Sequence, residues 1–395
     1  MRIGIVGGGI GGLSAALALR DRHEVTLFEA APAFAPVGAG IVLAPNAVAC
    51  LAGLGVAVDD GLGVELPAVE LRRSDGQLLT ASPAAVHRRT LGPTLGCARA
   101  DVHAALVAAL GAGTPVDLRL GAAVTAVDPA GPAVSVAGGP PEGFDLVVGA
   151  DGLHSPCRLA HGGGDVRYSG DTCWRGFAPD PGLETAVEWW GPRSRIGLVP
   201  VPGDRVYYFL VEAAPEGRSG DVGLEDLRRR FAGFPAAAAA VIDGLDERPP
   251  LHHDLCELDE PVWGTARLPL LGDAAHAMTP NLGQGAAMAI EDAVVLGRAL
   301  DGSPDGDDDD VLATAFAAYV AACHDRVRRI QLDARRLGGL SRIRGPLSRR
   351  ARDLAPRLTP DRIARQRFDE VALGGPASPA LPGHRDGDPD AGEAD

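Results

Sequence analysis

The 395-residue sequence predicts an α/β fold with two domains, on the basis of three observations. The chain opens with a βαβ pattern: an apolar strand at 2–7, an alanine-rich helical stretch at 11–22 and a second strand at 24–29. Residues 166–263 are β-rich and contain most of the aromatic side chains. Two long helical patterns follow residue 283. A chain of this length is longer than a single hydrophobic core usually supports, so we expect two packed domains.

The remaining elements follow from periodicity and from turn residues. Helices are expected over 45–54, 101–110, 283–300 and 311–337, and strands over 69–73, 77–80, 116–137 (with interruptions) and 144–149. The aromatic-rich interval should be a mainly antiparallel sheet with one helical interval at 224–243. Within it, a strand at 195–201, the turn Pro202-Gly203-Asp204 and a strand through Tyr207 predict a hairpin.

These elements predict a discontinuous first domain. It comprises residues 1–70, 98–165 and 265–345, whereas residues 71–97 and 166–264 form the β-sheet domain. Residues 346–373 are expected to be a C-terminal helical segment, and the Gly-, Pro- and Asp-rich residues 374–395 a disordered tail.

Composition limits the classes of function. The formal net charge of −15 disfavours binding to nucleic acid or to an anionic membrane. All 37 basic residues are arginine, which removes every lysine-dependent chemistry. No apolar run reaches the ~20 residues of a membrane span, and no signal peptide is expected. The six cysteines form no CxxC pair, so we expect free thiols and a cytoplasmic protein.

The glycine-rich segment GGGIGG at 7–12 follows the first strand and opens the first helix. Gly7 permits the tight turn, Gly9 lets the backbone approach a pyrophosphate, and Gly12 allows close packing of helix on strand. Glu29 ends the second strand, where an acid would bind a ribose hydroxyl. The segment predicts a bound dinucleotide without distinguishing FAD from NAD.

Two further motifs make that distinction. The segment Gly149-Ala150-Asp151-Gly152, ahead of Ser155 and Arg158, resembles the "DG" signature of flavoprotein aromatic hydroxylases. Gly272-Asp273, ahead of His276, Pro280 and the segment GQG at 283–285, resembles their "GD" signature. Arg99 with Leu106, and the segment GAGI at 38–41 (which contains Gly40) with Pro45-Asn46, also match this family.

From residue 2 to about residue 329, the chain therefore resembles the single-component, class A FAD-dependent monooxygenases, which include para-hydroxybenzoate, salicylate and urate hydroxylases. The resemblance implies a glutathione-reductase-type Rossmann domain that binds FAD. It implies that Asp273 accepts a hydrogen bond from the ribityl chain, that Asp151 lies near the pyrophosphate, and that Arg99 reaches the phosphate or ribityl side. Pro280, Asn281 and the glycines Gly283 and Gly285 should lie along the flavin ring. One departure is Ala30, where many relatives carry Arg or Lys.

The resemblance also implies the reaction. NAD(P)H would reduce FAD and leave, and O2 would then form a flavin C4a-hydroperoxide that hydroxylates or epoxidises an electron-rich aromatic or polyene small molecule. The alternatives are another flavin enzyme (a halogenase, reductase or oxidase) and a flavin-binding redox carrier or sensor. The missing lysine and the absence of a Trp-x-Trp-x-Ile-Pro stretch argue against a halogenase. The sequence leaves substrate, NADH or NADPH preference and oligomeric state open.

No catalytic base follows from a motif, so the substrate residues rest on weaker arguments. Arg195 is a candidate for binding an anionic substrate, against a simple salt bridge, and Tyr207 is a candidate hydrogen-bond donor in the pocket, against core packing. Adjacent Trp189 and Trp190 should face opposite sides of a strand, one in the core and the other available to cover the pocket.

Three other features have an ordinary interpretation that we favour. For His276 we favour a structural hydrogen bond over acid–base work. For His252-His253 we favour packing over metal binding, because no ligand falls at the required spacing. For the acidic run 301–310 we favour a linker over a calcium loop. No metal is expected.

Overall fold

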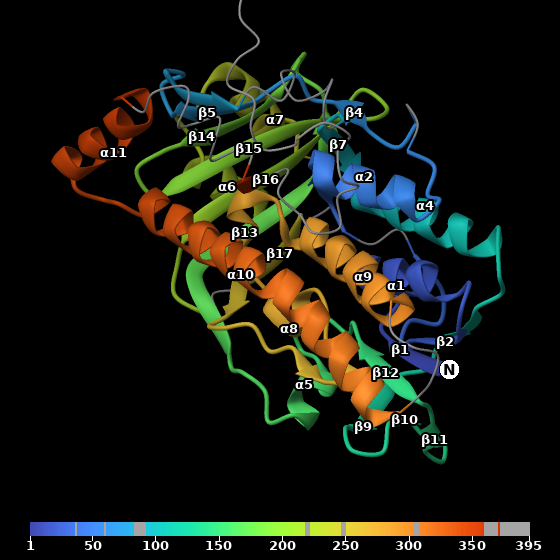
Figure 1. Ribbon diagram of the computed structural model, residues 1–395. Coiled ribbons are helices and arrows are strands. Elements are labelled where there is room, and N and C mark those ends of the chain that lie inside the picture. The colour runs from blue at the N-terminus through green and yellow to red at the C-terminus, as the bar shows by residue number, and fades with distance from the viewer. Residues whose placement is uncertain are drawn as a thin grey trace, which may run out of the picture.

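The computed structural model describes residues 1–35, 38–58, 61–82, 92–217, 222–245, 250–302, 308–358 and 370–371. Figure 1 shows two main sheets at opposite ends of the molecule, with the long helix α10 (Asp309–Ser341) running beside both. The expected disordered tail and part of the acidic run lie outside the described residues.

The first sheet is parallel and has the strand order β12-β1-β2-β8. Its strands are β12 (Leu146–Gly149), β1 (Arg2–Val6), β2 (Glu24–Glu29) and β8 (Asp117–Leu120). In the two central strands every residue between the first residue of each strand and the terminal Glu29 is buried, as expected for a sheet covered on both faces. Val6 pairs with Gly149 on one side and with Phe28 on the other, so the carboxyl ends of three strands lie together.

Helices and a small sheet surround this edge. Helix α1 (Ile10–Leu19) packs between α4 (Arg99–Gly111) and α9 (Gly285–Asp301). Helix α2 (Pro45–Gly53) also packs on α9, and β3 (Gly40–Leu43), β7 (Leu95–Ala98) and β4 (Val64–Glu65) form a three-stranded sheet. Strands β9 (Val124–Asp128), β10 (Ala133–Val136) and β11 (Glu142–Gly143) form another, near α5 (Pro156–Ala160).

The large sheet has seven strands in the order β17-β13-β16-β15-β14-β5-β6. They are β17 (Leu251–Leu258), β13 (Val166–Pro179), β16 (Arg205–Ala213), β15 (Ser194–Val201), β14 (Ala186–Trp190), β5 (Val69–Arg73) and β6 (Leu78–Ser82). All pairs are antiparallel except β14 with β5. The predicted hairpin is confirmed: β15 and β16 are joined by a turn in which Gly203 and Asp204 have positive φ.

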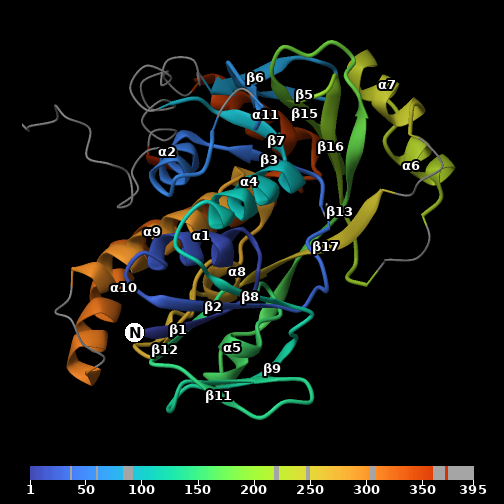
Figure 2. The same ribbon diagram turned by 90° about the vertical axis from the view of Figure 1, so that its right-hand side faces the viewer.

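Residues of this sheet alternate between two faces. On the outer face, Ile196 and Leu198 belong to a core with α6 (Leu224–Arg230) and α7 (Ala236–Asp243). Figure 2 shows these two helices on the side of the sheet away from α1 and α9. We call the opposite side, which bears Arg195, Gly197 and Val199, the inner face; it faces the parallel-sheet half of the molecule.

Helix α10 connects the two halves. The hydroxyl of Tyr319 donates to the carbonyl of Leu270, 2.9 Å away, beside the parallel sheet. The side-chain amide of Gln331 donates to Leu258 O (2.9 Å) at the end of β17. After the helix ends, the Arg342 guanidinium lies 3.1 Å from the carboxylate of Asp171 on β13.

The sequence prediction was wrong at two places. The helical interval 224–243 is two helices, because Gly233 takes a positive φ of 88° and Pro235, which lacks an N–H, begins the second helix. The helix expected from residue 283 begins at Gly285, because Gly283 (φ 65°) ends the 3₁₀ turn η1 (Pro280–Leu282). The described part of the C-terminal segment contains α11 (Pro346–Leu358).

Candidate active site

The three glycine motifs meet at the carboxyl edge of the parallel sheet. The Gly149 carbonyl, at the end of β12, accepts a hydrogen bond of 3.0 Å from the amide of Leu271, one residue before Gly272-Asp273. A Cβ added to Gly7 would lie 2.4 Å from the carbonyl oxygen of Ala150. Segments separated by more than 100 residues therefore form one continuous backbone surface.

Within the first motif, two glycines meet different requirements. A Cβ at Gly12 would lie 1.9 Å from the Gly7 carbonyl oxygen, so only glycine fits between helix and loop. A Cβ at Gly9 would have no protein atom within 4 Å, although Gly9 is the N-cap of α1 and has an ordinary φ of −75°. The open space therefore lies at the N-terminus of α1, where free amides and the helix dipole favour a phosphate.

Glu29 and helix α4, which begins with Arg99, both contact this region. The Glu29 carboxylate accepts hydrogen bonds from the amides of Gly8 (2.7 Å) and Ala31 (2.8 Å), which fix it beside the loop. His103 Nε2 lies 2.8 Å from the Gly8 carbonyl and connects the loop to α4. Arg99 is the first residue of α4, which begins two residues before the expected helix 101–110. Its side chain is exposed without an ion pair to any described carboxylate.

Asp273 and the start of α9 border one space. Asp273 begins the short helix α8 (Asp273–His276), and its carboxylate is exposed with no hydrogen bond to another described residue. A Cβ at Gly285 would lie 4.0 Å from Asp273 Oδ1. The N-cap residue of α9, Gln284, makes no side-chain capping bond, so the first amides of the helix remain available to a ligand. Pro280 and Gly283, in the turn before α9, are exposed.

A buried ion pair fixes the Gly272-Asp273 loop. Asp292 Oδ2, on α9, lies 2.6 Å from His276 Nε2 and accepts the Gly272 amide at 3.0 Å. Burial lowers the pKa of His276, but the charge and hydrogen bond of Asp292 outweigh it, so the pKa is raised overall. The structural role favoured for His276 agrees with this geometry.

Asp151 also braces the backbone. Its Oδ2 accepts the amide of Cys157 at the start of α5 (2.9 Å), whereas Oδ1 is buried without a partner in the described structure. One oxygen thus fixes the strand-to-helix connection and the other is unused by the protein.

A second buried polar cluster, under the start of α9, was not anticipated. Asn46 donates to Gln284 (3.2 Å) and to Glu291 (2.7 Å), and Glu291 pairs with Arg326 at 2.9 Å. The Oδ1 atom of Asn46 is buried without a described partner. Asn46 and Gln284 each belong to a motif that the sequence indicated, whereas Glu291 and Arg326 had not been singled out, because they come from segments 245 and 280 residues after Asn46.

Arg195 connects the large sheet to this region. It lies within β15 on the inner face, donates a hydrogen bond to Asn281 Oδ1 of η1 (2.5 Å), and pairs with Glu188 at 3.1 Å. Asp171 lies 3.9 Å away. The Nε atom of Arg195 is buried without a described partner. Arg195 is therefore both a salt-bridge residue and a donor with one unused N–H beside the flavin-ring motif.

Tyr207 shares the inner face with Arg195. Val199 pairs with Tyr207 and Arg195 with Val211, which places these side chains on one side of the sheet. A Cβ at Gly40 of β3 would lie 2.2 Å from the Tyr207 ring, so glycine there lets the two halves approach. Burial raises the pKa of Tyr207, and the phenol is neutral at physiological pH.

The adjacent tryptophans face opposite sides, as predicted. Trp189 belongs to the outer-face core, whereas the Trp190 indole donates to Glu188 (2.9 Å) and is covered by the Arg352 guanidinium of α11. The two adjacent histidines lie on β17, where His252 stacks on Trp174 with ring centroids 4.5 Å apart. Among the described residues, no group of three or more His, Cys, Asp or Glu side chains could bind a metal ion.

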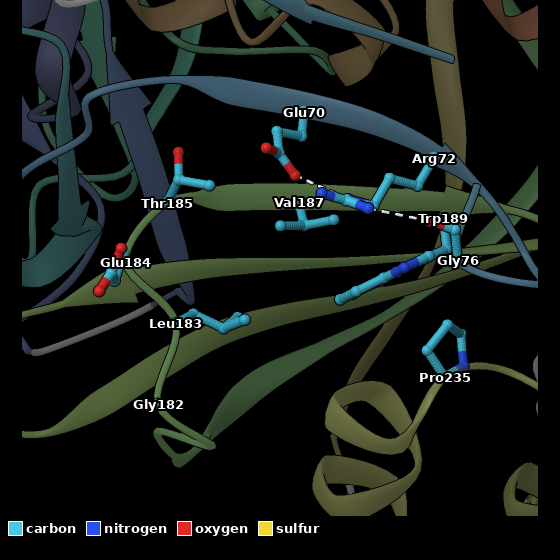
Figure 3. Close-up of a pocket in the computed structure, with 10 residues that line it drawn as sticks. All are labelled: Glu70, Arg72, Gly76, Gly182, Leu183, Glu184, Thr185, Val187, Trp189 and Pro235. Atoms are coloured by element: carbon cyan, nitrogen blue, oxygen red, sulfur yellow. Dashed lines mark hydrogen bonds and ion pairs between the residues drawn. The ribbon is translucent and has the colours of Figure 1, made fainter. Parts of the chain in front are cut away.

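A pocket of about 430 Å³ lies elsewhere. Figure 3 shows it between the β5–β6 hairpin, β14 and Pro235, with Val187 and Trp189 as its apolar wall. Glu70 and Arg72 at its rim already pair with each other at 2.6 Å. Because Val187 and Trp189 belong to the outer face, this pocket is separated by the sheet from the three motifs, and we assign it no part in the chemistry.

The parts of the motif site fit FAD. The space above Gly9 could hold a pyrophosphate, and Glu29 stands at the strand end where an acid can bind a ribose. Asp273 and the free amides of α9 could hold the ribityl chain and the flavin. Among the described residues, Asp151 Oδ1 has no hydrogen-bond partner and Arg99 pairs with no carboxylate. Fold and site together define a Rossmann-type flavoprotein with a second sheet that contacts the turn η1 and strand β3.

Comparison with known proteins identifies the family. Residues 1–332 match the family described as FAD binding domain. The chain is 36% identical over 357 residues to 3-amino-4-hydroxybenzoate 2-monooxygenase of Streptomyces platensis (85% of this chain, 87% of that protein). It is 34% identical over 313 residues to 2-heptyl-3-hydroxy-4(1H)-quinolone synthase of Pseudomonas aeruginosa (75% and 80%). The structure of Klebsiella pneumoniae HpxO complexed with FAD and uric acid matches with a TM-score of 0.83 and 28% identity over 95% and 97% of the two chains.

The chain belongs to this FAD-binding family, and it is an FAD-dependent monooxygenase of the class that includes aromatic-ring hydroxylases. The expected fold class and cofactor are confirmed. In the part of the chain that the structure describes, no helix is long and apolar enough to span a membrane. All six cysteines are free, and five of them are buried.

Proposed function

We propose that this monooxygenase uses NAD(P)H and O2 to insert one oxygen atom into an electron-rich aromatic small molecule, with release of water. Hydroxylation is the main outcome and epoxidation of a polyene the alternative. The observation that carries the proposal is the hydrogen bond between Arg195 and Asn281, which joins a side chain of the inner face directly to the turn η1. The family resemblance implies that this turn lies along the flavin ring. Substrate bound on this face would lie against the reacting edge of the flavin. The free buried thiols support a reducing compartment such as the cytoplasm.

The chain's residues divide into two groups. The first group binds FAD and consists of Gly7, Gly9, Gly12, Glu29, Gly40, Arg99, Asp151, Asp273, Gly283 and Gly285. Reduced FAD supplies the chemistry that activates oxygen. On the substrate side, the Arg195 guanidinium binds an oxygen of the substrate, Tyr207 provides a neutral hydroxyl, and Pro280 shapes the backbone beside the ring. Coverage of this space by both sheets excludes water from the reaction.

A screen of substrates tests this function. The FAD-loaded enzyme is supplied with NADH or NADPH and with aromatic acids, phenols, purines and quinolones, and both cofactor oxidation and product mass are recorded. We expect at least one compound to accelerate cofactor oxidation and to gain one oxygen atom. Cofactor oxidation without an oxygenated product from any compound would instead favour an oxidase, a reductase or a redox carrier.

Substitution of Arg195 tests the assignment of the substrate face. Arg195→Ala should raise KM or lower turnover by roughly 2–4 kcal/mol, the scale for removing one partner of a buried charged pair. FAD content should stay normal, because Arg195 contacts Asn281 rather than a residue of the phosphate loop. Arg195→Lys should restore only part of the activity, since an ammonium lacks the planar fork of the guanidinium. Unchanged kinetics in Arg195→Ala would reduce this residue to a salt bridge.

A further inference from the structure

Three cross-strand rows cover the inner face of the large sheet. The pairing register places His253, Cys173, Val211, Arg195 and Trp190 in the first row. The second row contains Leu251, Arg175, Phe209, Gly197 and Glu188. The third contains Phe177, Tyr207 and Val199. Residues in one row point to the same side of the sheet, because directly paired residues share a face.

The two outer rows are fixed to the flavin-binding half. The first is connected by the hydrogen bond from Arg195 to Asn281, and the third by the close approach of Tyr207 to Gly40. The middle row lies between them, and its side chains Phe209 and Arg175 remain partly exposed although they lie deep within the fold. The middle row therefore has partly exposed side chains between two rows that contact the other half of the molecule.

Gly197 gives this row a flat floor. A Cβ at Gly197 would lie only 1.8 Å from the ring of Phe209, so the ring lies directly over the glycine backbone. The ring of Tyr207 is 5.8 Å away, centroid to centroid. A planar aromatic substrate can stack or pack edge-on against such a surface.

The two arginines beside this floor differ in charge balance. Arg195 has the carboxylates of Glu188 and Asp171 at 3.1 and 3.9 Å, so its charge is already balanced. Arg175 forms no ion pair with any carboxylate among the residues the structure describes, and its Nε is buried without a hydrogen bond. Its neighbours on the face are the Tyr207 hydroxyl and the Cys173 thiol.

Those neighbours do not supply the missing negative charge. Burial raises the pKa of Cys173 to about 11 and also raises that of Tyr207, although Arg175 opposes both shifts. Burial, with Arg175, lowers the pKa of His253 to about 4, so this imidazole is neutral at physiological pH. The floor thus carries one unbalanced positive charge, which is costly in a partly buried site unless a ligand neutralises it.

We propose that Arg175 binds an acidic group of the substrate, and that the enzyme acts on planar aromatic anions, such as carboxylates or urate-like acids, rather than on neutral quinolones. Arg175 supplies the charge that selects the anion, Phe209 over Gly197 supports the ring, and Arg195 contributes a hydrogen bond beside the flavin. This inference rests on the proposed function, since it names the substrate class of the same site.

Binding to the FAD-loaded enzyme tests the inference through the change in flavin absorbance. The probes are salicylate, 4-hydroxybenzoate and urate, with salicylamide, 4-hydroxybenzamide and a 4-quinolone as neutral counterparts. In the wild type we expect at least one carboxylate to bind tenfold or more tightly than its amide. Arg175→Gln should remove that preference while leaving amide affinity within about twofold, and Arg175→Lys should retain part of it. The matched control is Arg193→Gln, at an exposed arginine directly before β15. It should change neither the affinity for the acid nor that for the amide.

Each other outcome has a distinct meaning. Equal affinity for acid and amide in the wild type, binding of the quinolone alone, or an equal loss for both ligands in Arg175→Gln would overturn the inference. If a neutral compound is oxygenated with one oxygen atom gained, the substrate class is wrong while the monooxygenase function stands. If no compound yields an oxygenated product, the proposed function itself fails. FAD content and melting temperature of each variant exclude loss of folding as the cause.

Discussion

The Asp273 carboxylate is an exposed acid at the end of a buried strand-to-helix connection, and it has no hydrogen bond to a described residue. The Asp292–His276 pair fixes the backbone on either side of Asp273. The position of the Asp273 carboxylate is therefore set by the fold. We therefore expect this carboxylate to contribute little to the stability of the apoprotein and more to the affinity for a bound ligand.

Asp273→Ala should therefore weaken FAD binding more than it affects the fold. Loss of a charge-assisted hydrogen bond costs roughly 1.5–3 kcal/mol, which corresponds to about a 10- to 100-fold weaker Kd. FAD fluorescence during titration of the apoprotein measures the change. Asp301→Ala, at the end of the same α9 region and remote from the motifs, is a control that should bind FAD normally. Normal affinity in Asp273→Ala would contradict the placement of the ribityl chain.

His276 should make stability depend on pH. Its pKa is raised in the folded protein above the unfolded value of 6.5, so its stabilising contribution is fully present below about pH 6.5 and is lost as pH rises through the folded pKa. The melting-temperature difference between the wild type and His276→Gln should therefore be larger at pH 6 than at pH 9. The exposed His154 provides a control, His154→Gln, that should show no such trend. A difference that grows toward pH 9 would show that His276 is neutral in the folded protein.

At the scale of the element, the first βαβ unit contains one glycine that the fold requires and one that it does not. Gly12 is required by the protein, because the Gly7 carbonyl leaves no room for a side chain. The fold does not require glycine at position 9, because no atom of the described residues lies within 4 Å of an added Cβ.

This difference predicts opposite behaviour of two matched variants. Gly9→Ala should leave the melting temperature of the apoprotein unchanged and weaken FAD binding at least tenfold, or ~1.4 kcal/mol, because the new methyl group occupies the approach of the pyrophosphate. Gly12→Ala should lower the melting temperature even without FAD. Thermal melts and FAD titrations of both apoproteins measure the two effects. A Gly9→Ala protein that is equally destabilised without FAD would show that the loop is closed by protein atoms.

At the scale of the molecule, the proposed function assigns FAD and substrate to different sheets, which meet at several separate contacts. Arg195 with Asn281, Tyr207 with Gly40 and Arg342 with Asp171 join the large sheet to the flavin-binding half. We expect substrate on the inner face to contact these same residues, so its binding should change the environment and the reduction rate of the flavin.

We therefore expect flavin reduction by NAD(P)H to be slow in the free enzyme and much faster with substrate bound. Stopped-flow absorbance of the flavin measures the rate. A bound mimic that cannot be oxygenated should divert the reducing equivalents to hydrogen peroxide, which a peroxidase-coupled assay detects. If the flavin is reduced at the same rate with every ligand, substrate binding does not affect the flavin, and the proposed coupling is wrong.

The sequence alone determined the FAD-binding half because its signals are local. Glycines at 7, 9 and 12 and an acid at 29 are dictated by backbone geometry within one βαβ unit, and the hairpin after Arg195 by the turn residues Gly203 and Asp204. The family signatures around Asp151 and Asp273 likewise lie within short segments. Each requirement is met within a few residues, so each is visible without the fold.

Only the tertiary structure decided the character of the inner face. Which side chains share a row depends on the register of β13, β15, β16 and β17, and a shift of one residue would exchange Arg175 for the outer-face Trp174. The charge balance of Arg195 depends on Asp171 and Glu188, which meet it only through strand pairing. Electrostatic balance is a property of distances between distant segments, which is why the sequence indicated Arg195 and overlooked Arg175.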